Sequence, residues 1–196
     1  MTPDFHASRL GEYRRHGDEA DLVFTRDYDH PVERVWEYIT EPALLRLWLA
    51  EAKVDLRLGG RYDLRWLNDP KGQLDWWTGT ITALQLGRVL DSDNSQHGPM
   101  RFELQRLAAD GSVTDAVLNT EAPDAADGAT RLTFSNAIAP PEEKFITMSL
   151  AGWHIHLDHL AAALDDDPPV WESWYDYYFP VWKKLHAAYQ HAYRLP

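Results

Sequence analysis

The spacing of hydrophobic positions changes several times along the chain. Residues 20–28 alternate between apolar and polar, with Leu22, Phe24 and Tyr28 on one face, and predict a first strand. After Pro31, a residue typical of a helix start, the apolar positions recur as on one face of a helix: Val32, Val35, Trp36 and Ile39. Pro42 then begins a second short helix that ends near Trp48.

Residues 52–136 return to alternation, interrupted by turn signals. Gly59-Gly60 and Asn68-Asp69-Pro70-Lys71-Gly72 are typical turn sequences, because proline fixes φ and glycine permits a positive φ. Further strands are expected at residues 54–56, 62–66, 77–83, 89–92, 100–107, 113–120 and 129–136. Several strands at such short spacing indicate an antiparallel sheet.

A long helix follows this sheet. Pro140-Pro141 and two glutamates form a helix start, and one apolar stripe then continues through Gly152: Ile146, Leu150, Trp153, Leu157, Leu160, Ala161 and Leu164. We therefore expect a single helix over residues 142–164, about 35 Å long at 1.5 Å per residue. The acidic run 165–167 is unfavourable at a helix C-terminus, and Pro168-Pro169 ends the element.

The C-terminal segment 168–196 is rich in aromatic residues: Trp171, Trp174, Tyr175, Tyr177, Tyr178, Phe179 and Trp182. A last helix is expected after Pro180. So large an apolar surface must be covered. The segment either packs on its own domain, as a lid or along the sheet edge, or forms the surface for a homodimer or another protein partner.

Composition and charge narrow the possible functions. The 196 residues carry a net charge of −12, which disfavours binding to nucleic acid or to an anionic membrane surface. The absence of cysteine excludes thiolate metal sites and cysteine nucleophiles. No apolar run approaches the roughly 20 residues that membrane insertion requires, and no secretion signal is visible. We expect a cytoplasmic protein without a cofactor.

The end of the first predicted strand and the two short helices after it resemble the corresponding segment of a known family. The run Arg26-Asp27-Tyr28-Asp29-His30-Pro31-Val32-Glu33-Arg34-Val35-Trp36, followed by Thr40-Glu41-Pro42 and Trp48, is similar to the start of the START-like (SRPBCC) superfamily. It is most similar to the branch named after the activator of heat-shock protein 90 ATPase. Gly59-Gly60, Gly79-Thr80-Ile81 and Gly152-Trp153-His154 fit that branch in order and spacing.

The resemblance implies an α+β helix-grip fold, in which a curved antiparallel sheet wraps around the long C-terminal helix. We divide the chain into an N-terminal arm (1–19), the helix-grip domain (20–167) and an aromatic helical extension (168–196). The fold alone does not assign a function. The first hypothesis is binding of a small hydrophobic molecule between sheet and helix. The alternatives are a cyclase or hydrolase and a chaperone-activator-like interaction module.

One sequence motif is typical of a metal site, but helix geometry argues against a metal site here. Residues 154–159 read His-x-His-x-Asp-His, the signature of the metallo-β-lactamase fold. At 100° per residue on a helix, His154 and His156 lie about 200° apart and His159 points away. One ion cannot collect all three, so no metal is expected. We interpret these histidines as solvated or edge positions.

The candidate site lies between the strands and the long helix. An apolar pocket is expected there, with these ligand-binding residues: Trp48, Trp66, Trp77, Phe102, Phe134, Trp153, His154 and Leu157. His154 with Asp158 one turn later is a weak candidate for a catalytic acid–base pair. Arg57, Arg61 and Arg65 alternate outward and are expected at the surface.

Overall fold

The computed structural model describes residues 9–17, 19–69, 71, 74–115, 128–138 and 143–196. Several predictions extend beyond these ranges and are not tested there: residues 1–8 of the arm, residues 116–120 of the strand predicted at 113–120, and residue 142 at the start of the long helix. None of the helices in the described part of the chain has the length and apolar character needed to cross a bilayer.

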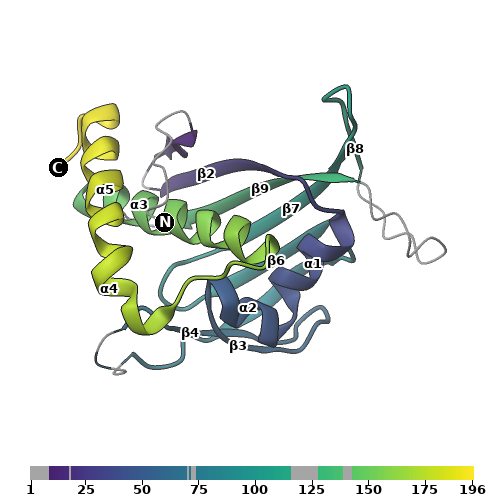
Figure 1. Cartoon of the computed structure of the whole chain (residues 1–196). Helices are drawn as coiled ribbons and strands as arrows, with labels where there is room; N and C mark the ends of the chain where they lie inside the picture. Colours follow the sequence, from purple (N-terminus) through teal and green to yellow (C-terminus); the bar gives the residue numbers. More distant parts are fainter. Residues whose placement is uncertain (1–8, 18, 70, 72–73, 116–127, 139–142) are drawn as a thin grey trace.

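A curved antiparallel sheet forms one layer of the molecule (Figure 1). Its strands in spatial order are β1 (Glu12–His16), β2 (Glu19–Tyr28), β9 (Ala129–Ile138), β7 (Met100–Leu107), β6 (Val89–Asn94) and β5 (Gly79–Gln85), with β8 (Val113–Asp115) paired to β7. A separate hairpin consists of β3 (Ala50–Val54) and β4 (Tyr62–Trp66). Strand β1 lies within the segment that the sequence pattern describes only as an arm.

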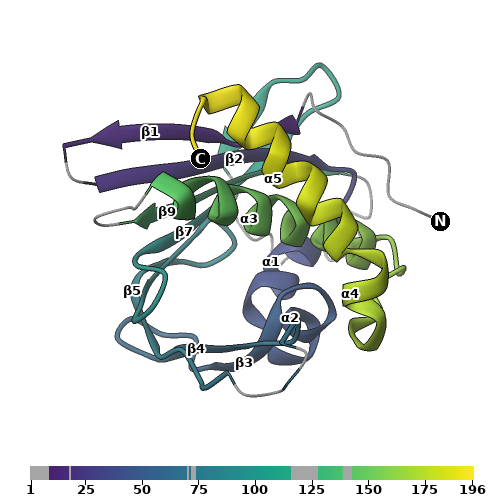
Figure 2. The ribbon, with the colours of Figure 1, turned by 90° about the vertical axis from the view of Figure 1, so that its left-hand side faces the viewer.

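The helices lie on the concave side of the sheet. They are α1 (Val32–Thr40), α2 (Pro42–Trp48), α3 (Glu143–Leu164), α4 (Trp174–Tyr177) and α5 (Phe179–Tyr193), and a short 3-10 helix covers Trp171–Ser173. Helix α3 continues through Gly152 without a break, as predicted. Figure 2 shows α5 lying across α3. The helix-grip α+β fold expected from the sequence is therefore confirmed.

The core is the contact between α3 and the inward faces of the central strands. Phe24, Phe134 and Phe102 stand opposite one another on β2, β9 and β7. The ring of Phe134 lies 4.9 Å from Phe102 and 4.4 Å from Trp153 of α3, between centroids. These rings are almost completely buried, so the predicted alternation correctly identifies the inward face of the sheet.

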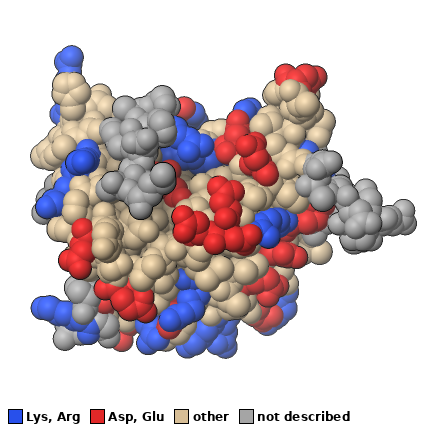
Figure 3. All heavy atoms as spheres, in the orientation of Figure 1, with Lys and Arg blue, Asp and Glu red and all other residues tan. Residues whose placement is uncertain are grey.

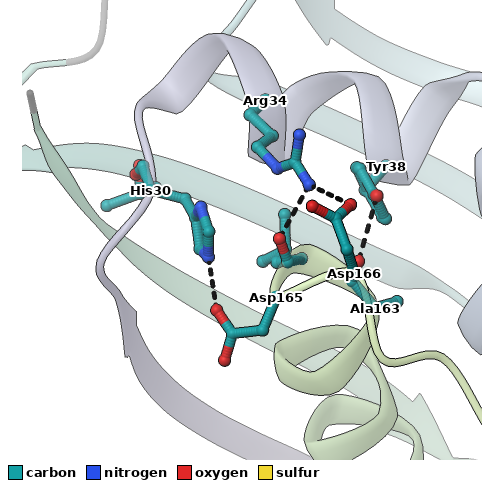
Figure 4. A network of polar contacts seen from close by, with 8 residues as sticks. His30, Arg34, Tyr38, Ala163, Asp165 and Asp166 are labelled. Atoms are coloured by element: carbon teal, nitrogen blue, oxygen red, sulfur yellow. Dashed lines mark hydrogen bonds and ion pairs between the residues drawn. The ribbon is translucent and has the colours of Figure 1, made fainter. Parts of the chain in front are cut away.

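The C-terminal end of α3 is held by side chains of α1 (Figure 4). Nη2 of Arg34 donates to the carbonyl oxygen of Leu164 and to the carboxylate of Asp166, both at 2.8 Å. The hydroxyl of Tyr38 donates to the carbonyl of Ala163 at 3.0 Å. These bonds satisfy carbonyl groups that a helix end leaves without a partner. Asp166 itself adopts a positive φ of 59°, a conformation that aspartate tolerates.

The acidic run after α3 is thus partly neutralised from α1. His30 Nε2 lies 2.8 Å from Oδ1 of Asp165, beside the Arg34 contacts (Figure 4). Acidic side chains nevertheless gather on the face of the molecule around the region where α3 ends beside α1 (Figure 3). The unfavourable charges at the helix end are therefore tolerated because a cation from another element reaches them.

Candidate functional site

A pocket of about 290 Å³ lies between β4, the first half of α3 and α5. Its described lining residues are Trp66, Asn68, Leu74, Trp77, His97, Phe145, Met148, Ser149, Gly152, Trp153, His156 and Trp182. Most of this surface is aromatic or aliphatic, with a few polar groups. This composition is typical of a small-molecule site, and the volume lies just below the usual range of about 300–1,000 Å³.

Gly152 leaves room for the pocket. A Cβ atom added at Gly152 would meet nothing within 4 Å, apart from its chain neighbours and its own helix backbone. Glycine inside a helix costs roughly 0.5–1 kcal/mol relative to alanine. The helix therefore carries glycine, the least favourable helix residue apart from proline, at the position where a side chain would enter the pocket.

Indole rings form the walls. The ring of Trp66 lies 5.5 Å from Trp77 and 5.8 Å from Trp153 between centroids, both in edge-to-face geometry. Nε1 of Trp153 donates to Oδ1 of Asn136 at 3.0 Å, which fixes the orientation of this ring. Trp182 reaches the pocket from α5, so the C-terminal extension supplies one wall.

Two imidazoles face the same pocket. Nδ1 of His156 lies 3.1 Å from the carbonyl oxygen of Trp48; because a carbonyl only accepts, Nδ1 carries the proton and Nε2 keeps its lone pair. Burial lowers the pKa of His156 to about 4. Burial, together with the nearby His156, lowers the pKa of His97 to about 4. Both rings are therefore neutral near pH 7.

The sequence-based interpretation of the α3 histidines as solvated or edge positions is wrong. His154, His156 and His159 are all at least 96% buried. The C-terminal extension covers two of them: Tyr189 of α5 lies against His154, and Trp174 of α4 donates its Nε1 proton to Nε2 of His159 at 3.3 Å. His156 lies against Trp66 of β4 and the Trp48 carbonyl. An isolated amphipathic helix gives no indication of the element that covers its second face.

The three histidines turn to different partners. His154 faces α5, His156 faces the pocket and the Trp48 carbonyl, and His159 faces α4. Within the described ranges, no three His, Asp or Glu side chains are grouped so that they could hold a metal ion.

His154 belongs to a buried polar chain outside the pocket. The Gly11 amide donates to the Tyr189 hydroxyl at 2.7 Å, and that hydroxyl lies 2.8 Å from Nδ1 of His154. Nε2 of His154 lies 3.5 Å from Oδ2 of Asp158. Burial, with a smaller contribution from the Arg26 charge, lowers the pKa of His154 to about 3. His154 and Asp158 are therefore close together, as their spacing predicts, but neither is among the pocket-lining residues.

The predicted ligand-binding residues divide into two groups. Trp66, Trp77 and Trp153 line the pocket; the others do not: Trp48, Phe102, Phe134, His154 and Leu157. Trp48 is fully buried beside α1, where its Nε1 donates to the Tyr38 carbonyl at 2.8 Å. Phe102, Phe134 and Leu157 are part of the solid core.

Sequence reasoning missed the other pocket residues for two reasons. Asn68, Leu74 and His97 lie in loops, whose positions hydrophobic periodicity does not predict. Trp182 lies on the extension, outside the resemblance. One signal was available, because a glycine within a long apolar helical stripe often marks a packing or functional requirement.

The aromatic extension packs against its own chain. The Trp171 indole donates to the Arg46 carbonyl at 2.9 Å, and the Tyr175 hydroxyl donates to the Asn68 carbonyl at 3.2 Å. Trp174 is buried, whereas Tyr177 remains 64% exposed. The extension thus connects α2, the loop after β4 and α3. A homodimer or partner surface on its exposed side stays a prediction.

Solved structures with the same fold are found by comparison. Protein EF2215 of Enterococcus faecalis is 18% identical with a TM-score of 0.67, covering 94% of this chain and 90% of that one. CalU16 of Micromonospora echinospora is 20% identical with a TM-score of 0.60, covering 93% and 95%. The product of BPP1335 of Bordetella parapertussis is 18% identical with a TM-score of 0.59, covering 97% and 94%. Such identities establish the fold alone.

A comparison with curated proteins gives no match. The family model described as Activator of Hsp90 ATPase homolog 1-like protein matches residues 29–165, which is more than half of the chain. The matched region begins just before α1 and ends just after α3. On this evidence, the chain belongs to the family of activator of Hsp90 ATPase homolog 1-like proteins, within the START-like superfamily.

Proposed function

We propose that this protein binds a small hydrophobic molecule in the pocket between β4, α3 and α5. The observation that carries the proposal is the pocket of about 290 Å³ walled by indole rings, with Gly152 leaving open space on its helical side. An apolar pocket with few convergent polar groups is the usual form of a ligand site.

The rim of the pocket supports the same proposal. Phe145 and Met148 are 45% and 39% exposed, and Leu74 is 42% exposed on the facing loop. Contact between these apolar side chains and a bound apolar molecule would stabilise the complex, since each square ångström of apolar surface removed from water contributes about 25 cal/mol.

Binding is a better proposal for this pocket than catalysis by the predicted pair. His154 and Asp158 lie outside the lining residues, and the His154 Nδ1 atom is occupied by Tyr189. A catalytic group must come within hydrogen-bond reach of its substrate. The cytoplasmic location stays a prediction.

The test uses N-phenyl-1-naphthylamine, an uncharged dye whose fluorescence rises in apolar surroundings. We expect one dye molecule to bind per chain, and the Gly152→Leu variant to weaken binding at least about tenfold. The added side chain has no atom to clash with at its Cβ, but it fills the pocket. Gly152→Ala is the matched control, because a methyl group leaves most of the volume free.

Two results would contradict the proposal. One is the absence of dye binding to the wild-type protein. The other is equal dye binding by the wild type and by a folded Gly152→Leu variant, which would place the dye elsewhere on the surface. Circular dichroism and a cooperative thermal transition establish that each variant is folded.

A further inference from the structure

The pocket carries no formal charge. None of its described lining residues is Asp, Glu, Lys or Arg, and both imidazoles, His97 and His156, are neutral near pH 7. An ion moved from water into such surroundings without a partner loses solvation that nothing here replaces. The charge-free lining therefore favours an uncharged ligand over a carboxylate or a phosphate ester.

Charged groups lie instead in a neighbouring hollow. That hollow shares Trp66 and Leu74 with the pocket and also contains Glu51 and Arg65. Glu51 accepts hydrogen bonds from both Arg65 and Arg46. These cations are already engaged by a carboxylate, so they do not make the pocket a site for an anionic ligand.

The walls favour a flat ring system. Trp66 approaches from β4, Trp77 from the segment before β5, Trp153 from α3 and Trp182 from α5. Aromatic pairs that stack or meet edge to face gain binding free energy beyond the burial of their area. An alkyl chain of equal area does not gain this contribution.

One ring nitrogen of the lining residue His156 is a hydrogen-bond acceptor without a partner in the described part of the chain. Nδ1 of His156 is engaged by the Trp48 carbonyl, and Nε2 bonds to no residue that the structure describes. His156 lines the pocket and is otherwise almost completely buried, so we take the pocket as the side from which a donor approaches Nε2.

A hydroxyl group fits this corner of the pocket. It offers one donor, which the lone pair on Nε2 of His156 accepts. On the basis of the proposed function, we infer that the ligand is an uncharged, flat aromatic molecule with a hydroxyl group that donates to Nε2 of His156.

The experiment measures displacement of N-phenyl-1-naphthylamine by four compounds at about pH 7. 2-Naphthol carries the hydroxyl, 2-methoxynaphthalene has it blocked by a methyl group, 2-naphthoate carries a charge, and 1-decanol carries a hydroxyl on an alkyl chain. We expect 2-naphthol to bind about tenfold more tightly than each of the other three, since one desolvated hydrogen bond corresponds to roughly this factor.

The variant His156→Asn tests the assigned acceptor. Asparagine keeps an N–H near the place of Nδ1, able to donate to Trp48, but it has nothing in the place of Nε2. We expect 2-naphthol binding to weaken about tenfold and 2-methoxynaphthalene binding to stay within about twofold. The matched control is His159→Gln, which alters a buried histidine of the same helix outside the pocket and keeps an acceptor for Trp174.

The outcomes separate the two proposals. If Gly152→Leu abolishes dye binding but the wild type binds 2-naphthol and 2-methoxynaphthalene with equal affinity, the hydroxyl inference is overturned. The proposed function is then still supported. Equal or tighter binding of 2-naphthoate or 1-decanol likewise overturns the inferred ligand class. Absence of dye binding overturns both proposals. The wild-type comparison needs no variant, so a misfolded His156→Asn protein does not remove the test.

Discussion

The hydroxyl of Tyr189 joins His154 of α3 to the N-terminal segment: it accepts the Gly11 amide proton and donates to Nδ1 of His154 at 2.8 Å. Nε2 of His154 faces the Asp158 carboxylate at 3.5 Å, and because a carboxylate only accepts, the proton of this neutral imidazole is on Nε2. Nδ1 is therefore the atom that accepts from the Tyr189 hydroxyl. A helix-edge histidine is thereby converted into a buried link between α3, α5 and the segment before β1.

Loss of this hydroxyl should destabilise the fold without affecting the pocket. Tyr189→Phe leaves the buried Gly11 amide and His154 Nδ1 without partners, and we expect a loss of about 1–3 kcal/mol in the free energy of unfolding. Urea denaturation measures it, with Tyr177→Phe at an exposed position as the control, expected within about 0.5 kcal/mol of wild type. If Tyr189→Phe weakened dye binding as much as Gly152→Leu does, the hydrogen-bond network of Tyr189 would not be independent of the pocket.

Arg34 should stabilise the end of α3. Arg34→Met removes the bonds to the Leu164 carbonyl and to Asp166 while keeping a side chain of similar length. We expect a loss of about 1–2 kcal/mol. Arg14→Met is the matched control, because Arg14 pairs with Glu12 at the exposed surface, where such pairs contribute less than about 1 kcal/mol. Equal losses for the two variants in urea denaturation would show that the helix end does not depend on Arg34.

Stability should fall with decreasing pH because of the buried histidines. The pKa of His156 is lowered by burial from 6.5 to about 4, and that of His154 to about 3. The unfolded chain therefore binds protons below pH 6.5 that the native protein does not, and the free energy of unfolding falls as pH decreases from about 6.5 towards 4. Each such histidine contributes about 1.4 kcal/mol per pH unit at most.

Comparison of wild type with His159→Gln isolates this effect from the titration of other groups. Burial holds the pKa of His159 well below its ordinary value, so the variant should lose about 1 kcal/mol less than wild type between about pH 7.5 and 5.5. Denaturation curves at the two pH values give the difference. Identical pH dependence in both proteins would mean that His159 protonates equally well in the folded state.

The same substitution at two glycines should have opposite effects. Gly152→Ala should raise the free energy of unfolding by about 0.5–1 kcal/mol, because alanine is the better helix former and its Cβ meets nothing within 4 Å. Gly79→Ala should lower it by about 1–3 kcal/mol, since its Cβ would lie 2.4 Å from the Tyr62 carbonyl oxygen and 2.6 Å from that of Asp93. Thermal denaturation of both variants shows whether each substitution stabilises or destabilises the protein. Destabilisation by Gly152→Ala would mean that there is no room for a Cβ atom at this position.

Local patterns predicted the elements because each depends on neighbours in sequence. The apolar stripe from Ile146 to Leu164 identified one continuous helix, and alternation around Phe102 and Phe134 identified the inward face of the strands. Periodicity cannot distinguish a residue in the solid core from one that lines a pocket, since both are apolar and inward. Three of the predicted ligand-binding residues, Trp66, Trp77 and Trp153, therefore line the pocket, whereas Phe102 and Phe134 fill the core.

The amino-acid sequence by itself determined the long helix, the antiparallel strands and the family motif, because hydrophobic periodicity and turn chemistry act over a few residues. Only the tertiary structure decided what covers the second face of α3, where His97 lies and which ring nitrogens are free. Those features arise from contacts between segments far apart in sequence: the Trp48 carbonyl fixes the proton of His156, and α5 brings Trp182 to the pocket. No local pattern encodes such distances, so the site exists only once α5, α3 and β4 have packed together.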